Sequence, residues 1–163
     1  MRKSLSFLLA ILLVSLTSCS SVSSSEETHM PDPADAYIEA VTYMFSENST
    51  QTTNLSYLAV DLSLVPDLTD DQKADVLSGL TLENITAFGD SYDALVENGY
   101  IVDSVFTNGA FLTITECEMS DSSVTMDLLL VLPDNNRIGY NELRYDYLNE
   151  VWEFVGFSTI FVT

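Results

Sequence analysis

The sequence predicts an α+β fold in which N-terminal helices pack on one face of a C-terminal four-stranded antiparallel meander. Two observations carry this expectation: helix signals lie before residue 100, and segments rich in Thr, Val, Leu, Ile and aromatic residues follow. Short turns separate these segments, which are residues 110–119, 123–132, 138–147 and 151–162. Helices that come first and strands that are grouped last are typical of α+β domains.

Two long helices are expected in the first half of the domain. Asp32 and Pro33 are a favourable N-cap and first helical residue, and apolar residues at helical spacing predict a helix over residues 33–47. Thr69 and Gln72 match a capping box, in which side chains bridge the free backbone donors at a helix start. A second helix is therefore expected directly after Thr69.

A strand and a third helix complete this half. Residues 55–62 are mostly apolar, as in a largely buried strand. Asp90 is the expected N-cap of a short helix, and Gly99 is a typical residue to end it. The span of residues 32–163 has the size of a single domain.

The first 31 residues have the composition of an export signal and a tether. Arg2 and Lys3 precede an apolar run of about a dozen residues, which is too short for a membrane-spanning helix. The sequence Leu-Thr-Ser before Cys19 resembles the lipobox of bacterial lipoproteins. This resemblance implies a signal peptide at residues 1–18, a diacylglyceryl group on Cys19, and lipid anchoring at the extracytoplasmic face of the cell membrane. Residues 19–31 are rich in Ser and are expected to be a flexible tether.

The charge of the mature chain excludes one class of partner. Removal of residues 1–18 leaves Lys73, Arg137 and Arg144 against 25 carboxylates, a formal charge of −22. A field of this sign repels phosphate backbones, so nucleic acid is not an expected partner. The same field favours solubility outside the cell, or the attraction of cations or a basic partner.

No catalytic constellation is visible in the sequence, and no cofactor is expected. The single histidine, His29, falls in the predicted tether, where it cannot be held as a base beside a nucleophile. Zinc needs several His or Cys ligands, and we expect Cys117 to be a buried small hydrophobic side chain. Glu116 and Glu118 are expected on one side of a strand, either as a solvated strand edge or as the carboxylate pair of a small hydrolase.

Calcium is the metal for which the sequence offers candidate ligands. Four acidic residues crowd around the start of the second predicted helix: Asp67, Asp70, Asp71 and Asp75. Carboxylate oxygens are ligands that Ca²⁺ prefers. Acidic residues are also favoured at helix starts because they face the positive end of the helix dipole, and this second interpretation needs no metal.

Aromatic residues cluster in the last predicted hairpin, among them Tyr140, Tyr145, Tyr147 and Trp152. On an open curved sheet they could line a pocket for a sugar, a peptide or a lipid. Aromatic side chains on a sheet face more often belong to the core. The sequence leaves both interpretations open.

The order of elements is similar to two groups of proteins. Leading helices followed by a meander that ends in residues 151–156 (VWEFVG) resemble the closing part of NTF2-like and cystatin-like domains. Residues 55–62 together with residues 68–73 (LTDDQK) are similar to small uncharacterised proteins of Gram-positive bacteria. The strand expected between the first two helices departs from the NTF2-like order. Neither resemblance implies catalytic residues, and a shared fold alone would not give function.

The sequence therefore predicts a non-enzymatic envelope lipoprotein with a binding or interaction domain at the cell surface. Its expected partners are the membrane, through the lipid on Cys19, and a peptide, a glycan or another envelope protein. A small carboxylate-dependent hydrolase and a calcium-dependent surface protein are the alternatives.

Overall fold

The computed structural model describes residues 31–163, so the predicted signal peptide, Cys19 and His29 lie outside the described residues. The helices are α1 (Pro33–Glu47), α2 (Ser49–Thr52), α3 (Asp70–Gly79) and α4 (Tyr92–Glu97). The strands are β1 (Tyr57–Leu64), β2 (Thr86–Gly89), β3 (Ile101–Val102), β4 (Val105–Phe106), β5 (Gly109–Ser120), β6 (Ser123–Val131), β7 (Arg137–Leu148), β8 (Val151–Gly156) and β9 (Thr159–Val162). None of these helices is both long enough and apolar enough to cross a membrane.

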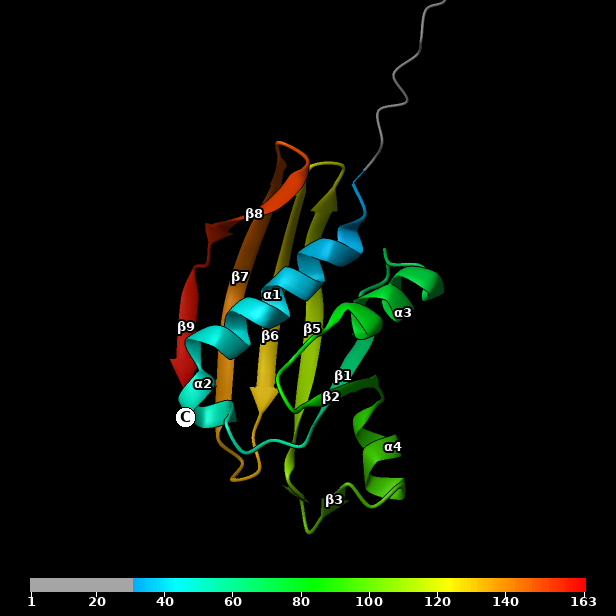
Figure 1. Ribbon diagram of the computed structural model, residues 1–163, viewed down its shortest axis with the longest axis vertical. Helices are drawn as coiled ribbons and strands as arrows, with labels where there is room; N and C mark the ends of the chain where they lie inside the picture. The colour runs from blue at the N-terminus through cyan, green and yellow to red at the C-terminus, as the bar shows by residue number, and fades with distance from the viewer. Residues whose placement is uncertain (1–30) are drawn as a thin grey trace, which may run out of the picture.

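Seven strands form one mixed sheet in the order β2-β1-β5-β6-β7-β8, and β9 also pairs with β7 (Figure 1). The predicted α+β class is confirmed. The predicted four-stranded antiparallel meander is wrong, because β1 joins the sheet through parallel pairs with β2 and β5. Parallel neighbouring strands are joined by long crossover connections, so no local sequence pattern predicts their pairing. The last predicted strand, residues 151–162, is divided into β8 and β9.

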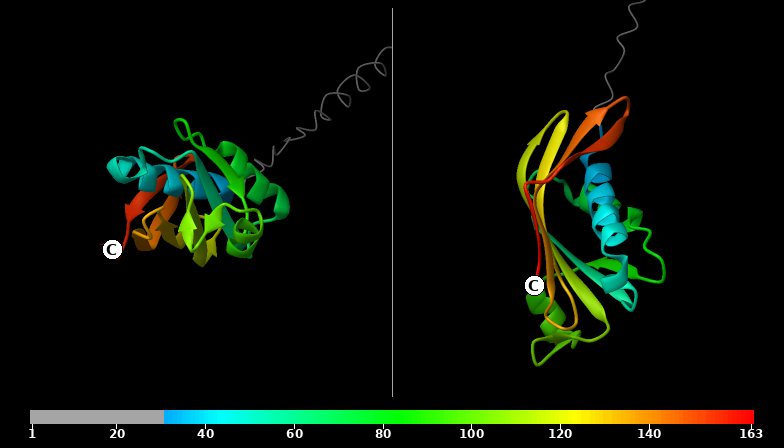
Figure 2. Two further views of the ribbon diagram at one scale, coloured as in Figure 1. Left: turned by 90° about the horizontal axis from the view of Figure 1, so that it is seen from below. Right: turned by 90° about the vertical axis from the view of Figure 1, so that its left-hand side faces the viewer.

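Bulges bend the sheet around α1. The register shifts in four neighbouring pairs, which are β1–β5, β5–β6, β6–β7 and β7–β8. In β5 the extra residue is Cys117, which lies between two residues that keep their partners on β6. A bulge bends its strand and increases the local twist. Figure 2 shows the result, a strongly curved sheet with α1 lying in its hollow.

The main core lies between α1 and the hollow face of the sheet. Tyr37 and Met44 of α1 are fully buried, at helical spacing, as the predicted helix over residues 33–47 requires. Along β6, buried and half-buried residues alternate, and Met126 and Leu128 lie on the buried side. Val76 of α3 belongs to the same core.

Helix α4, which is the third of the predicted helices, packs on the opposite face of the sheet. The expectation that the helices share one face is therefore wrong for α4. Leu95 of α4 joins Ala59, Phe106 and Phe111 in a second cluster. Ala59 and Phe111 alternate with main-core residues along β1 and β5, and successive strand residues point to opposite faces.

The predicted helix boundaries can be compared with the caps in the structure. Thr69 Oγ1 accepts the Gln72 N–H (3.2 Å) and the Gln72 side chain accepts the Thr69 N–H (3.0 Å), so the capping box is confirmed. The N-cap of α4 is Ser91 instead of Asp90, which uses its carboxylate to accept the Ser91 N–H (2.9 Å). Gly99 follows the C-cap of α4 with φ +77°, the conformation in which glycine ends helices.

Candidate functional site

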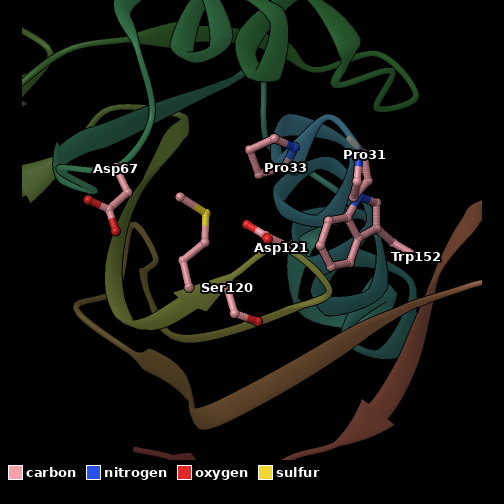
Figure 3. Close-up of a pocket in the computed structure, with 7 residues that line it drawn as sticks. Pro31, Pro33, Asp67, Ser120, Asp121 and Trp152 are labelled. Carbon is pink, nitrogen blue, oxygen red and sulfur yellow. The ribbon is translucent and has the colours of Figure 1, made fainter. Parts of the chain in front are cut away.

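A pocket of about 180 Å³ lies at the end of the sheet where α1 begins. Its walls come from the start of α1, the β1–α3 loop, β8, and the end of β5 with the β5–β6 turn. The lining residues are Pro31, Pro33, Asp67, Met119, Ser120, Asp121 and Trp152. In Figure 3, Asp67 and Trp152 stand on opposite sides, and Asp121 points into the space between them.

Hydrogen bonds through Asp32 fix the start of α1 beside the pocket. The Asp32 carboxylate caps the helix by accepting the Ala34 N–H (3.0 Å). Trp152 Nε1 donates to the main-chain carbonyl of Asp32 (2.9 Å), and Gln72 Nε2 donates to its carboxylate (3.3 Å). These bonds join α1 to β8 and α3. They also satisfy the polar atom of the indole, so that its apolar ring serves as pocket wall.

The β5–β6 turn presents Asp121 at the rim of the pocket. Ser120 Oγ accepts the N–H groups of Ser122 (3.4 Å) and Ser123 (3.1 Å). Serine side chains close turns in this way by replacing main-chain acceptors. Asp121, at the tip of the closed turn, is exposed.

A buried tyrosine and a second carboxyl group lie near Asp67. Tyr37 Oη donates to Glu116 Oε2 (2.8 Å), which ties α1 to β5. Burial raises the pKa of Glu116, and the Asp67 carboxyl raises it further, whereas the hydrogen bond from Tyr37 and the charge of Lys73 lower it. Burial and Glu116 also raise the pKa of Tyr37, so its phenol remains a donor. Glu116 is therefore protonated more readily than an ordinary glutamate.

The pocket combines negative charge with apolar walls. No lysine or arginine lines it, and over residues 31–163 the single ion pair, Arg144 with Asp146 (2.8 Å), involves neither pocket carboxylate. Besides Asp67, Asp121 and Ser120, the pocket is lined by proline, methionine and tryptophan side chains. This combination suits a cation with an apolar stem, because the stem packs on the walls while the charge meets a carboxylate or the indole face.

The four aspartates considered as calcium ligands do not converge. Asp67 lines the pocket, whereas Asp70 and Asp71 lie exposed in the first turn of α3, and Asp75 is exposed further along that helix. Across the described residues, no group of three His, Cys, Asp or Glu side chains is placed to hold a metal ion. The favourable interaction with the helix dipole accounts for Asp70 and Asp71.

The four candidate aromatic residues divide between the core and the pocket. Tyr140 and Tyr145 are 1% and 3% exposed and belong to the main core, and they do not line the pocket. Trp152 lines the pocket. Tyr147 is half-buried and packs against Trp152, with ring centres 5.3 Å apart. Of the four, Trp152 is the one available to a ligand there.

Glu116 and Glu118 do not form the pair considered for a hydrolase. Glu116 pairs with Met126, on the side of α1, whereas Glu118 pairs with Thr125, on the other side of the sheet. The expected two-residue alternation fails because the bulge at Cys117 inserts a residue between them. The carboxyl group near Glu116 comes from Asp67 instead.

Cys117 is exposed, which corrects the expectation of a buried side chain. As the extra residue of the bulge it has no regular place in the pleat. Partial desolvation and the neighbouring Asp127 raise the pKa of the thiol to about 11. The reactive thiolate form is therefore scarce at neutral pH.

Sequence reasoning did not find Met119, Asp121 or Pro33 as pocket residues. The sequence shows a turn around Asp121 and a helix start at Pro33, but nothing local places these features side by side. The bond from Trp152 to Asp32 joins positions 120 residues apart, and the bond from Tyr37 to Glu116 joins positions 79 apart. The pocket is a product of tertiary structure.

Comparison of the chain with protein-family models, curated proteins and solved structures gives no match. The resemblances to bacterial lipoproteins, to NTF2-like or cystatin-like domains and to small proteins of Gram-positive bacteria stay predictions.

Proposed function

We propose that this protein is a lipid-anchored extracytoplasmic binding domain whose pocket takes a basic side chain of a peptide or protein partner. The observation that carries this proposal is the pocket itself, which is lined by Asp67 and Asp121 together with apolar side chains that include Trp152. A lysine or arginine side chain has the matching chemistry, since it combines an apolar stem with a charged head.

The size of the pocket favours a side chain over a whole small molecule. Its volume is about 180 Å³, whereas pockets that enclose drug-sized ligands span roughly 300–1,000 Å³. A glycan is also a weaker candidate, because Ser120 is the one uncharged hydrogen-bonding side chain besides the indole N–H, which already donates to Asp32. A basic side chain that projects from a larger partner fits both the small volume and the few uncharged hydrogen-bonding groups of the pocket.

The charge of the whole chain supports the same partner. The chain carries 25 acidic against 5 basic residues. Such a field raises the local concentration of positively charged partners and accelerates their association. The pocket then supplies the selectivity that a diffuse field lacks.

The proposed anchor would keep the pocket near the membrane. Pro31, which lines the pocket, is twelve residues from Cys19, a stretch that spans at most about 43 Å. A partner of the pocket would then be a protein or peptide at the same membrane surface. The anchor is tested separately, since Cys19→Ala should abolish metabolic labelling with a fatty acid.

Binding is tested with the full chain extracted in mild detergent. A lysine-rich peptide is titrated against the protein, with the lysine-acetylated peptide as the uncharged control. Trp152→Leu should weaken binding about three- to thirtyfold, because cation–π contacts contribute about 0.5–2 kcal/mol. Equal affinity for both peptides would contradict the proposal.

A matched pair of variants distinguishes binding in the pocket from attraction by the overall negative charge of the chain. Asp121→Asn and Asp134→Asn each remove one carboxylate from an exposed turn, but Asp121 lines the pocket, whereas Asp134 lies in the β6–β7 turn at the other end of β6. We expect Asp121→Asn to weaken binding more than Asp134→Asn does. If the two variants lose the same affinity, attraction is diffuse and the pocket is not the site.

A carboxylate-dependent hydrolase is the second candidate, and the raised pKa of Glu116 beside Asp67 favours it. A general acid needs such a shifted pKa, and a second carboxylate would complete the pair. Against it, Glu116 does not line the pocket and its carboxyl accepts the Tyr37 hydroxyl. Turnover of a peptide or glycoside panel that Glu116→Gln abolishes would favour the enzyme.

A further inference from the structure

The start of the described chain forms part of the pocket wall. Pro31 lines the pocket, and Trp152 Nε1 donates to the main-chain carbonyl of the next residue, Asp32 (2.9 Å). The chain therefore passes directly beside the indole before it enters α1. His29, the only histidine of the sequence, lies outside the described residues, two positions before Pro31.

Two prolines restrict how the chain approaches the pocket. A residue that precedes proline is confined to extended conformations. Asp32, before Pro33, has such a conformation, with φ −75° and ψ 115°. The same restriction applies to Met30, before Pro31. Because side chains two positions apart in an extended chain point to the same side, we expect His29 to project to the side on which Pro31 lines the pocket.

His29 is also close enough to enter the pocket. Two residues span at most about 7 Å, and the imidazole side chain adds to this reach. Between the predicted lipid site at Cys19 and Pro31, His29 is the one side chain that can carry a positive charge. A group attached to its binding site by a short linker has an effective concentration on the order of millimolar. It therefore competes well with a free ligand of the same chemistry.

The groups that face the pocket favour a protonated imidazole. Asp67 comes from the β1–α3 loop and Asp121 from the β5–β6 turn, whereas β8 contributes Trp152 and α1 contributes Pro33 (Figure 3). An imidazolium can donate an N–H to a carboxylate and place its charge on an indole face. A neutral imidazole has one N–H donor and no charge to offer, so protonation decides how well it fits.

The other charged groups around the pocket have partners of their own. The Asp32 carboxylate caps α1, and Glu116 accepts the Tyr37 hydroxyl. Lys73 of α3 acts on Glu116 and does not line the pocket. Three more carboxylates on the surrounding elements are exposed and do not line it: Asp35 of α1, Asp70 of α3 and Glu153 of β8. The two lining carboxylates are therefore the groups that a cation in the pocket meets.

We propose that protonated His29 of the same chain occupies the pocket and excludes the basic side chain of a partner. This inference rests on the proposed function, since both ligands use the same carboxylates and the same indole. An ordinary histidine gains its proton as pH falls through about 6.5, whereas a lysine side chain stays charged over this range. The pocket is therefore open to a partner above this pH and is filled by its own chain below it.

The titration of His29 tests the proposal on the full chain in mild detergent, where labelled histidine gives NMR signals from this one residue. We expect a pKa above the ordinary value. Asp121→Asn should lower it by about half a pH unit or more, because it removes an opposite charge close to the ring. Asp134→Asn, in an exposed turn at the other end of β6, is the matched control for the general negative charge and should lower it less. Equal shifts in the two variants would overturn the proposal.

Peptide affinity measures the competition itself. Affinity for the lysine-rich peptide should fall about threefold between pH 8 and pH 5.5, as it does when an internal ligand fills about two-thirds of the pockets. His29→Gln should remove most of this loss, and the remainder belongs to Glu116, which that variant keeps. A loss of the same size in both proteins would overturn the proposal. If the peptide binds neither protein at either pH, while the His29 pKa still depends on Asp121, the proposed function is contradicted and the internal contact stands.

Discussion

The pocket beside Trp152 and the sheet edge formed by residues 154–162, in β8 and β9, are built in opposite ways. The pocket gathers four distant segments and places two carboxylates among apolar walls, whereas the edge is one continuous segment without a charge from Phe154 onward. The pocket end is also held by buried groups such as Tyr37, while the edge exposes its side chains. The same domain therefore has a charged pocket that depends on tertiary contacts and an uncharged edge that one stretch of sequence forms.

The largest expected effect contrasts the stability of the two regions. Tyr37→Ala should lower the free energy of unfolding by about 3–5 kcal/mol, because it empties a fully buried site. Ile160→Ala, at a side chain that is 44% exposed, should change it by about 0.5 kcal/mol or less. Denaturant unfolding can be followed by fluorescence, since Trp152 is the sole tryptophan of the chain. Similar losses of unfolding free energy for both variants would show that the two regions do not differ in this way.

This contrast also explains how much of the fold could be predicted. Helix α1 and strand β6 follow from local patterns, since Asp32 and Pro33 begin the helix and every second residue of β6 is buried. The parallel pairs of β1 are not predictable in this way, because they join segments separated by α3 and α4. Leu95 of α4 packs against Ala59 and Phe111, which the parallel pairing of β1 with β5 brings together.

The candidate site was less accessible to sequence reasoning than the fold. Trp152 and Asp67 were both named among the candidates, but for different ligands and with different neighbours. Their meeting with Asp121 needs the curvature of the sheet, which arises from bulges such as the one at Cys117. A bulge depends on cross-strand pairing, so the alternation of Glu116 and Glu118 misled the prediction.

Cys117 extends the comparison to a charged part of the sheet. Its raised pKa of about 11 should make alkylation at pH 8 roughly two hundredfold slower than for an ordinary exposed thiol, since the thiolate is the reactive form. Asp127→Asn should accelerate the reaction, because it removes a carboxylate that raises this pKa. Mass spectrometry of the alkylated chain over a pH series measures both effects. An inflection near pH 8.5, the ordinary thiol pKa, would show that neither desolvation nor Asp127 raises the pKa of this thiol.

The smallest expected effect concerns Glu116, the acidic group tied to Tyr37 behind the pocket. Because folding raises its pKa above the ordinary 4.5, the folded state favours the protonated carboxyl. The stability from this group is present below about pH 4.5 and is lost as pH rises through the raised pKa. Glu116→Gln keeps a neutral group that can accept the Tyr37 hydroxyl, so its unfolding free energy should fall less than that of the native chain above pH 4.5.

Glu118→Gln is the matched control for this pH dependence. It removes the same charge two residues away, from an exposed position on the other face of the sheet. If only Glu116→Gln flattens the pH profile of denaturant unfolding, the effect belongs to the partly buried contact with Tyr37 and Asp67 and not to the general charge. If both variants flatten it equally, the repulsion among all carboxylates governs the profile, and the pocket end is no different in this respect from the rest of the acidic surface.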